Sequence, residues 1–525
     1  MGGAAFSALS TPVGGSALSN DAKVKIFNQL TFEGESLQSN GITGDELFKV
    51  LMKRHEDLTT LYGTESFTCP KVRFGRTGIM MPVLSLGGMR QQQTWNPAEG
   101  LEFKDINKEI QANFEAIADR AMRFGINHFE TARGYGTSEL QYAPVIRKYP
   151  RESFILQTKV VPQKDAAKFR ELLDRSFSEL GLTQEGDYVD LFSFHGVNKP
   201  CHLEWIIESN MEIVKEFQAA GKIRHVGFST HGMAPFITQV IETGLFSYVN
   251  LHYQWVGSYT ASGSGDEGGN APALRAAKEQ DMGVFIISPT DKGGALYEPP
   301  KALYRDCLPL TPIAFHNLWL WSHDDLIHTI VVGAARPSDL DEHLDALMKY
   351  DQRRELSHPV MMKLKKRVTD AMGEDFFDSW AKSLPDAYES PLGISVGYLY
   401  WLWWITKYWG MANFAQKRYA SLEANLKTWD DNKSEAENKE QFSWVPSLPF
   451  RPEQEDLIRA HLAEHGGAFF TPEKVDHIVA AMREVHSWLH TGGCLARNDL
   501  PPDVNVEDWK VAYNLQPDKP YPERG

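Results

Sequence analysis

The feature that most constrains this chain is an alternation of apolar strand patterns with helical patterns over residues 83–348. The strand patterns are rich in Val, Ile and Leu and cover 83–88, 127–132, 154–160, 188–195, 223–229, 247–253, 283–289 and 328–333. The helical patterns cover 107–124, 138–147, 166–180, 203–219, 233–243, 271–280, 312–321 and 337–348. Continuous apolar strands are typical of parallel sheets that are buried on both faces. The alternation therefore predicts an α/β fold, a (β/α)8 TIM barrel.

A barrel of about 250 residues accounts for only the middle of this 525-residue chain. Residues 1–71 begin with a Gly, Ala, Ser and Thr composition that predicts a flexible tail, and then show the pattern of a small helical extension. Residues 72–350 are expected to form the barrel and to begin with a short β-hairpin around Arg76–Gly78. Residues 351–525 are predicted to be a helical, aromatic-rich region, so the barrel carries helical extensions at both ends.

Three successive strand patterns of the predicted barrel end in side chains that can handle a proton. Glu130 lies near the end of the first of them and Tyr135 just beyond it, Lys159 belongs to the second, and His195 ends the third. Catalytic residues of TIM barrels lie at the carboxyl ends of the strands. A tyrosine there can give a proton to a carbonyl oxygen if a cation lowers its pKa from about 10. Each residue alone has a structural explanation, but the four together predict a catalytic site.

The segment Glu130–Gly136, with Ser138 and Glu139 after it, resembles the aldo-keto reductase family and in particular its predicted-oxidoreductase branch. The resemblance implies an NAD(P)H-dependent oxidoreductase that reduces an aldehyde or a ketone by hydride transfer. It makes Tyr135 the general acid, Lys159 its cationic neighbour, Glu130 the carboxylate that holds the lysine, and His195 the group that orients the carbonyl. Most of the family has Asp in place of Glu130, and the extra methylene shifts the carboxylate by about one bond length.

The same resemblance assigns cofactor binding to a set of polar residues and one glycine in the later strands: Ser229, Thr230, Asn250, Ser288, Gly333, Arg336, Asp339 and His343. Thr230 and Asn250 differ from the family's usual Asn and Gln, and Ile287 replaces a Tyr whose ring stacks on the nicotinamide. Arg336 is the candidate for a 2′-phosphate, because a guanidinium offers two parallel hydrogen bonds. These residues favour NADPH as the cofactor. NADH is the alternative, because Asp339 stands where NADP-dependent members commonly have Arg or Gln.

Composition excludes several other classes of function. A net charge of −15 argues against nucleic acid as the main partner. The four cysteines form no close pair, so neither a metal cage nor the iron–sulfur cluster common in the branch is expected. His486 and His490 are four apart but lack a third ligand, so we predict no metal. The amino terminus shows no signal peptide, which favours a cytoplasmic protein.

Two further segments could suggest other functions. Gly263–Gly268 has the spacing of a dinucleotide-binding loop, but no strand comes immediately before it, so we interpret it as a loop over the barrel mouth. The aromatic run Tyr398–Ile405 is too short to span a membrane and predicts a buried helix or, alternatively, a surface for a protein partner. We expect a solvated linker over Asp430–Glu437.

The sequence thus leaves two hypotheses. The first is a reductase of a small-molecule carbonyl substrate whose identity the residues do not specify. The second is an aldo-keto-reductase-like barrel that serves as a structural or interaction subunit, weakly active or inactive, with a protein partner bound through the C-terminal helical region. The departures at Glu130, Asn250, Ile287 and Asp339 support the second hypothesis.

Overall fold

The computed structural model describes residues 67–97, 100–257, 269–390, 392–442, 445–465 and 470–491. The predicted tail and helical extension before residue 67 lie outside this part of the chain, as do the Gly263–Gly268 loop and residues 492–525.

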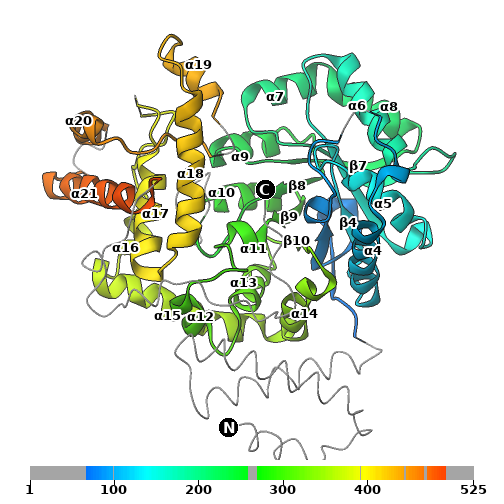
Figure 1. Ribbon diagram of the computed structural model, residues 1–525, viewed down its shortest axis with the longest axis horizontal. Helices are drawn as coiled ribbons and strands as arrows, with labels where there is room; N and C mark the ends of the chain where they lie inside the picture. The colour runs from blue at the N-terminus through cyan, green and yellow to red at the C-terminus, as the bar shows by residue number, and fades with distance from the viewer. Residues whose placement is uncertain are drawn as a thin grey trace, which may run out of the picture.

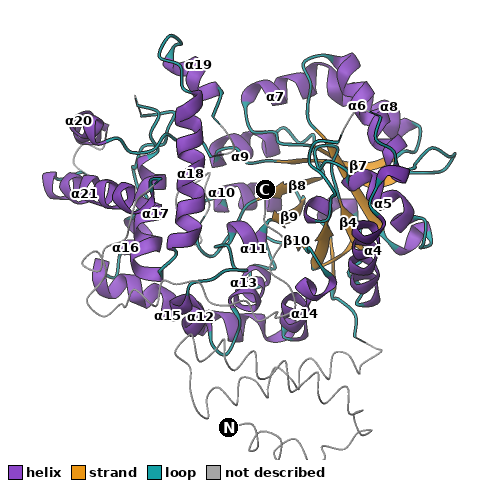
Figure 2. Ribbon diagram, viewed as in Figure 1, coloured by secondary structure: helices purple, strands orange, loops and turns teal. Residues whose placement is uncertain are grey.

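Eight parallel strands form a closed barrel, as the sequence predicts (Figure 2). Each strand pairs with the next one along the chain, and the last pairs with the first. The strands are β3 (Leu84–Gly87), β4 (His128–Glu130), β5 (Ile155–Val160), β6 (Val189–Phe194), β7 (Ile223–Ser229), β8 (Tyr248–Leu251), β9 (Gly283–Ile287) and β10 (Thr329–Gly333). All strand ends that carry the predicted catalytic residues therefore face the same end of the barrel.

Helices surround the barrel at the predicted places. They are α4 (Lys108–Arg123), α5 (Ser138–Ile146), α6 (Ala166–Glu179), α7 (Pro200–Trp205), α8 (Met211–Ala219), α9 (Ala234–Glu242), α10 (Ala271–Glu279), α13 (Pro312–Trp321) and α14 (Asp341–Met348). The predicted helix 203–219 is divided, because a π-helical turn over Ile206–Asn210 separates α7 from α8. Two further helices, α11 (Pro289–Lys292) and α12 (Lys301–Cys307), follow β9 and were not predicted.

The predicted hairpin closes the amino-terminal end of the barrel. Its strands β1 (Lys71–Arg73) and β2 (Met80–Pro82) are antiparallel, with Val72 opposite Met81. Phe74 follows β1, is fully buried, and has its ring centroid 4.5 Å from that of Phe285. The hairpin thus seals the end of the barrel opposite the predicted site.

After the barrel come seven helices that pack on one side of it (Figure 1). They are α15 (Arg353–Met372), α16 (Phe376–Ser379), α17 (Val396–Trp409), α18 (Ala412–Thr428), α19 (Glu435–Glu440), α20 (Glu455–His465) and α21 (Pro472–Leu489). In Figure 1 they lie beside α9, α10, α11 and α13, and away from α4, α5 and α6. The predicted linker is wrong in its second half, because Ser434 forms a capping box with Glu437 and starts α19.

The aromatic helix α17 is buried within its own chain, which agrees with the predicted buried helix. All of its side chains are buried except that of Lys407. The Trp401 indole N–H donates to the Val256 carbonyl at 2.6 Å, and the Trp409 and Trp255 ring centroids lie 4.7 Å apart. The barrel and the C-terminal helices therefore share one hydrophobic core. Among the helices described here, none is long and apolar enough to cross a membrane.

Candidate active site

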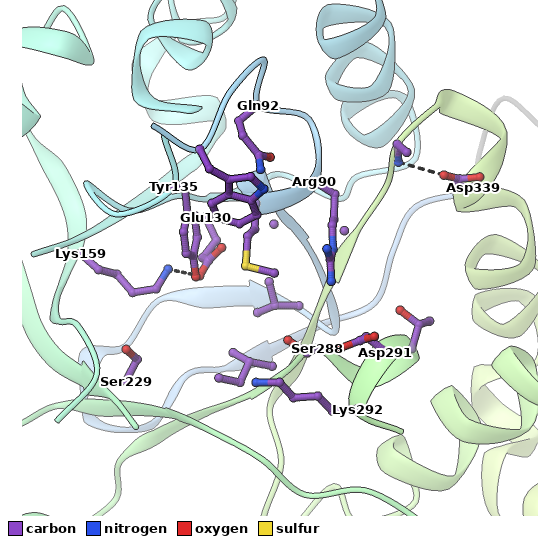
Figure 3. A pocket seen from close by; sticks show the side chains of 18 of the residues that line it. Arg90, Gln92, Glu130, Tyr135, Lys159, Ser229, Ser288, Asp291, Lys292 and Asp339 are labelled. Carbon is purple, nitrogen blue, oxygen red and sulfur yellow. Dashed lines mark hydrogen bonds and ion pairs between the residues drawn. The ribbon is translucent and has the colours of Figure 1, made fainter. Parts of the chain in front are cut away.

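A cavity of about 570 Å³ opens at the carboxyl ends of the barrel strands (Figure 3). Its wall comes from β3, β4, β5, β7, β9 and β10, from the segments that follow them, and from His195 just after β6. It is lined by Gly87, Met89, Arg90, Gln92, Gln93, Thr94, Trp95, Glu130, Tyr135, Lys159, His195, Ser229, His231, Ile287, Ser288, Thr290, Asp291, Lys292, Tyr297, Val331, Gly333, Ala335 and Asp339. This volume is in the range of pockets that hold small molecules.

The four predicted catalytic residues meet at one end of this cavity. Lys159 Nζ donates to the Glu130 carboxylate and, at 2.8 Å, to the Thr131 carbonyl. The same ammonium lies 4.5 Å from the centre of the Tyr135 ring. The His195 and Tyr135 ring centroids are 5.4 Å apart, with the two planes nearly perpendicular. Glu130 therefore reaches Lys159 directly despite its extra methylene.

The turn that presents Tyr135 is held by a glycine. Gly136 has φ +56°, and a Cβ added there would lie 1.8 Å from the Thr94 carbonyl oxygen. No other residue type fits so close to that backbone. The turn therefore packs directly against the segment after β3, which forms the rim of the cavity.

Burial decides the protonation states at this end. It raises the pKa of the Tyr135 hydroxyl well above its ordinary value, and the Glu130 carboxylate raises it further. Burial and the Lys159 charge lower the pKa of His195 to about 3. Burial also lowers the pKa of Lys159, although Glu130 opposes this. Tyr135 is thus protonated and His195 neutral near pH 7, and the expected lowering of the Tyr135 pKa by Lys159 is not found.

A second polar group in the cavity was missed by the sequence analysis. Arg90 follows β3, and Asp291 and Lys292 belong to α11 just beyond β9. Lys292 Nζ lies 3.1 Å from His252 Nε2, and the His252 ring stacks on His231 with centroids 4.6 Å apart. The signal for this group was the placement of charged residues shortly after two barrel strands.

The far end of the cavity is formed by the loop after β10. Gly333 lines it, and a Cβ there would lie 2.7 Å from the Arg90 side chain. Asp339 also lines it and accepts hydrogen bonds from the Ala335 N–H at 2.8 Å and from Arg336 Nε at 2.9 Å. The guanidinium of Arg336 is therefore engaged by a carboxylate at the place where a 2′-phosphate was predicted to bind.

Half of the predicted cofactor-binding residues line the cavity, and half do not. Ser229, Ser288, Gly333 and Asp339 do. Arg336 lies behind Asp339, and the other three are buried behind the wall. The Thr230 hydroxyl donates to the Val197 carbonyl at 2.7 Å, Asn250 Oδ1 accepts from Gln157 at 3.1 Å, and His343 Nδ1 accepts from Asn317 at 2.7 Å.

The comparisons with known proteins agree with the barrel and with the strand-end residues. Residues 83–255, which contain β3 to β8 and all four predicted catalytic residues, match the model of the Aldo/keto reductase family. Over these residues the barrel is similar to the aldo-keto reductase family. The C-terminal helices α15 to α21 lie outside the matched residues.

Individual relatives of this barrel are distant. An NADH-specific methylglyoxal reductase of Escherichia coli is 24% identical over 332 residues, which cover 53% of this chain and 93% of the relative. An aldo-keto reductase from Bacillus halodurans in a holo form is 18% identical and covers 56% of this chain and 96% of its own, with a TM-score of 0.45. One from Klebsiella pneumoniae in complex with NADPH is 17% identical, covers 55% and 96%, and has a TM-score of 0.41.

The residues of the cavity fit a nicotinamide dinucleotide, the cofactor that the family implies. At the Tyr135 end, His195 Nδ1 is buried and has no hydrogen-bond partner within the described ranges. Arg90 and Lys292 can face phosphates, and Gly333 leaves room for the Arg90 side chain. Asp339 can accept hydrogen bonds from ribose hydroxyls. No group of three or more potential metal ligands occurs in the part of the chain that the structure describes.

Proposed function

We propose that this protein is a nicotinamide-dependent reductase of a small aldehyde or ketone, with Tyr135 as the general acid. The observation that carries the proposal is the convergence of Tyr135, Lys159, Glu130 and His195 at one end of the cavity. A proton donor, a cation beside it, a carboxylate that holds the cation and a neutral imidazole are the groups that reduction of a carbonyl requires.

Each residue has a distinct role in this proposal. When bound, the reduced nicotinamide supplies the hydride for the carbonyl carbon. The neutral His195 can donate an N–H to the carbonyl oxygen and orient it. Tyr135 gives its phenolic proton to that oxygen, so the product is an alcohol. Lys159, held by Glu130 and the Thr131 carbonyl, stabilises the negative charge that remains on the tyrosine oxygen.

Burial keeps the Tyr135 hydroxyl protonated across neutral pH, so the side chain is in the form of a proton donor when a substrate binds. The same raised pKa makes this hydroxyl a weak acid. Transfer of its proton therefore depends on the Lys159 ammonium, 4.5 Å from the centre of the ring, to stabilise the tyrosinate that forms.

We further propose that the cofactor is NADH rather than the NADPH that the sequence favoured. Asp339 faces the cavity and engages Arg336, so a carboxylate stands where a 2′-phosphate needs a free cation. A carboxylate at the adenosine ribose accepts hydrogen bonds from the 2′-hydroxyl of NAD and repels the 2′-phosphate of NADP. The NADH-specific relative from Escherichia coli supports the same choice.

The alternative role as a structural or interaction subunit has less support. One of its supports was an aromatic run of the C-terminal region that could present a surface to a partner. That run lies in α17, whose aromatic side chains are buried against the barrel and against α21. The catalytic residues, by contrast, are in contact with one another and with the cavity.

Titration of the protein with NADH and NADPH tests this proposal. The chain has 14 tryptophans, so quenching or energy transfer reports binding. We expect micromolar affinity for NADH and weaker binding of NADPH, followed by NADH oxidation with small aldehydes such as methylglyoxal. Absence of binding up to about 1 mM, which corresponds to about −4.1 kcal/mol, would contradict the proposal.

A further inference from the structure

Helix α18 lies outside the family-matched residues, yet one of its side chains contacts a residue that lines the cavity. Arg418 is buried, with its side chain only 7% exposed. Its Nη2 donates to the Asp291 carboxylate at 3.1 Å and approaches the Asp291 carbonyl oxygen at 3.4 Å. Asp291 itself lines the cavity on α11, next to Lys292 (Figure 3). Arg418 therefore holds both the side chain and the backbone of this part of the wall from behind.

The contact of Arg418 changes the charge that the cavity presents. Burial raises the pKa of Asp291, but Arg418 and Arg90 outweigh it and hold the pKa below its ordinary value. Asp291 is thus a carboxylate between two guanidinium groups. Without Arg418, the negative charge of Asp291 would face the cavity and would be only partly balanced by Arg90.

Other contacts show that α18 is fixed against this side of the barrel. Asn413 Nδ2 and Lys417 Nζ donate to Glu298, at 3.1 Å and 2.6 Å. Gly294, two residues beyond Lys292, has φ +129°, and a Cβ there would lie 2.6 Å from the Met411 methyl group. The segment after β9 is therefore shaped by the C-terminal region.

We propose that α18 is an integral part of the dinucleotide site and that Arg418 is a positioning residue for it. This inference rests on the proposed function. Arg418 neutralises Asp291 and fixes α11, so that the stretch of cavity between the catalytic end and Asp339 accepts the doubly negative diphosphate of the cofactor. The barrel residues alone would leave Asp291 only partly compensated, by Arg90 and Lys292, beside that diphosphate, and like charges that are shielded from water repel strongly.

NADH binding by full-length variants tests the role of Arg418. In Arg418→Met we expect the Kd for NADH to rise by about tenfold or more, equivalent to at least about 1.4 kcal/mol. In Asp291→Asn/Arg418→Met the repelling carboxylate is also gone, so the Kd should return to within about threefold of the wild type. Lys427→Ala is the matched control: it removes an exposed cation in the last turn of the same helix and should leave the Kd unchanged.

The outcomes separate this inference from the proposed function. Wild-type affinity in Arg418→Met overturns the role of Arg418 while leaving the reductase proposal intact. An equal loss in the single and double variants, both folded by circular dichroism, also overturns it, because charge compensation is then not the cause. If Arg418→Met does not fold, the double variant decides, since it carries no unpaired buried charge. Failure of the wild-type protein to bind NADH overturns the proposed function and this inference together.

Discussion

The two ends of the cavity are built in different ways. At the catalytic end, Glu130, Lys159 and His195 lie in or at the ends of neighbouring strands, and Tyr135 is held by a glycine turn. At the far end, Asp339 lies in the segment after β10 and engages Arg336, three residues before it. Between the two ends, Asp291 lies in the short helix α11 and is held by Arg418 of α18. The proposed catalytic group is thus positioned by the strands, whereas the rest of the wall depends on loop, short-helix and C-terminal residues.

The largest effect is expected at the catalytic end. Tyr135→Phe should lower the turnover number by about 10²- to 10⁴-fold, because the proton donor is lost. Its Kd for NADH should stay within about twofold of the wild type, since the ring remains in place. Steady-state kinetics and fluorescence titration measure the two quantities. Unchanged turnover would remove Tyr135 from its proposed role.

The ion pair beneath Tyr135 should control the free energy of unfolding. The side chains of Lys159 and Glu130 are 1% and 3% exposed. Lys159→Met leaves Glu130 as an unpaired buried charge and should cost about 3–5 kcal/mol, measured by urea unfolding. Adding Glu130→Gln should recover most of this stability but no activity. Recovery of activity in the double variant would show that the ion pair has only a structural role.

His343 should affect stability in acid but not cofactor binding, because it lies behind the wall. Burial lowers its pKa to about 3 from an ordinary 6.5. Above pH 6.5 it is neutral whether the chain is folded or not. As the pH falls below 6.5, the unfolded chain binds the proton first, so stability is lost, by about 2 kcal/mol at pH 5. His343→Asn should remove this contribution, as denaturant unfolding at pH 8 and pH 5 would show.

The His343→Asn variant also tests whether His343 contributes to the wall of the cavity. His343→Asn should leave the Kd for NADH at pH 7 within about twofold of the wild type. A loss of tenfold or more, about 1.4 kcal/mol, would show that His343 reaches the cofactor after all.

The smallest effect is expected at Asp339. In Asp339→Asn the carboxylate that engages Arg336 is replaced by a neutral amide, so a 2′-phosphate can compete for the guanidinium. We expect the affinity for NADPH to rise by about tenfold and that for NADH to change less. Arg336→Ala in the same background should abolish the gain. Equal affinities for NADPH in the wild type and Asp339→Asn would contradict the proposed basis for cofactor choice.

The barrel could be predicted from the sequence because its strands are buried on both faces. Such strands read as continuous apolar runs, and each predicted run contains an observed strand, from β3 to β10. The same regularity placed Lys159 and His195 correctly, since the carboxyl ends of parallel strands meet at one end of the barrel. The place of Tyr135 at this end was predicted from its position in a glycine-flanked turn.

The far end could not be predicted in the same way, because side-chain partners there come from distant positions. Thr230 and Asn250 are polar residues near strand ends, but their hydrogen bonds go to Val197 and Gln157 rather than into the cavity. Arg418 is separated from Asp291 by 127 positions in the chain. No periodicity or spacing in the sequence connects two such residues.

The shared core also bears on how such a protein can evolve. Trp255 belongs to the segment after β8 and Trp409 to the C-terminal region, and both are fully buried against each other. A barrel separated from the helices would expose these rings to water and favour aggregation. Recombination that cuts the chain near residue 350 would therefore disrupt this shared core. A substitution on one side of the aromatic contact would alter the packing of the residue on the other side.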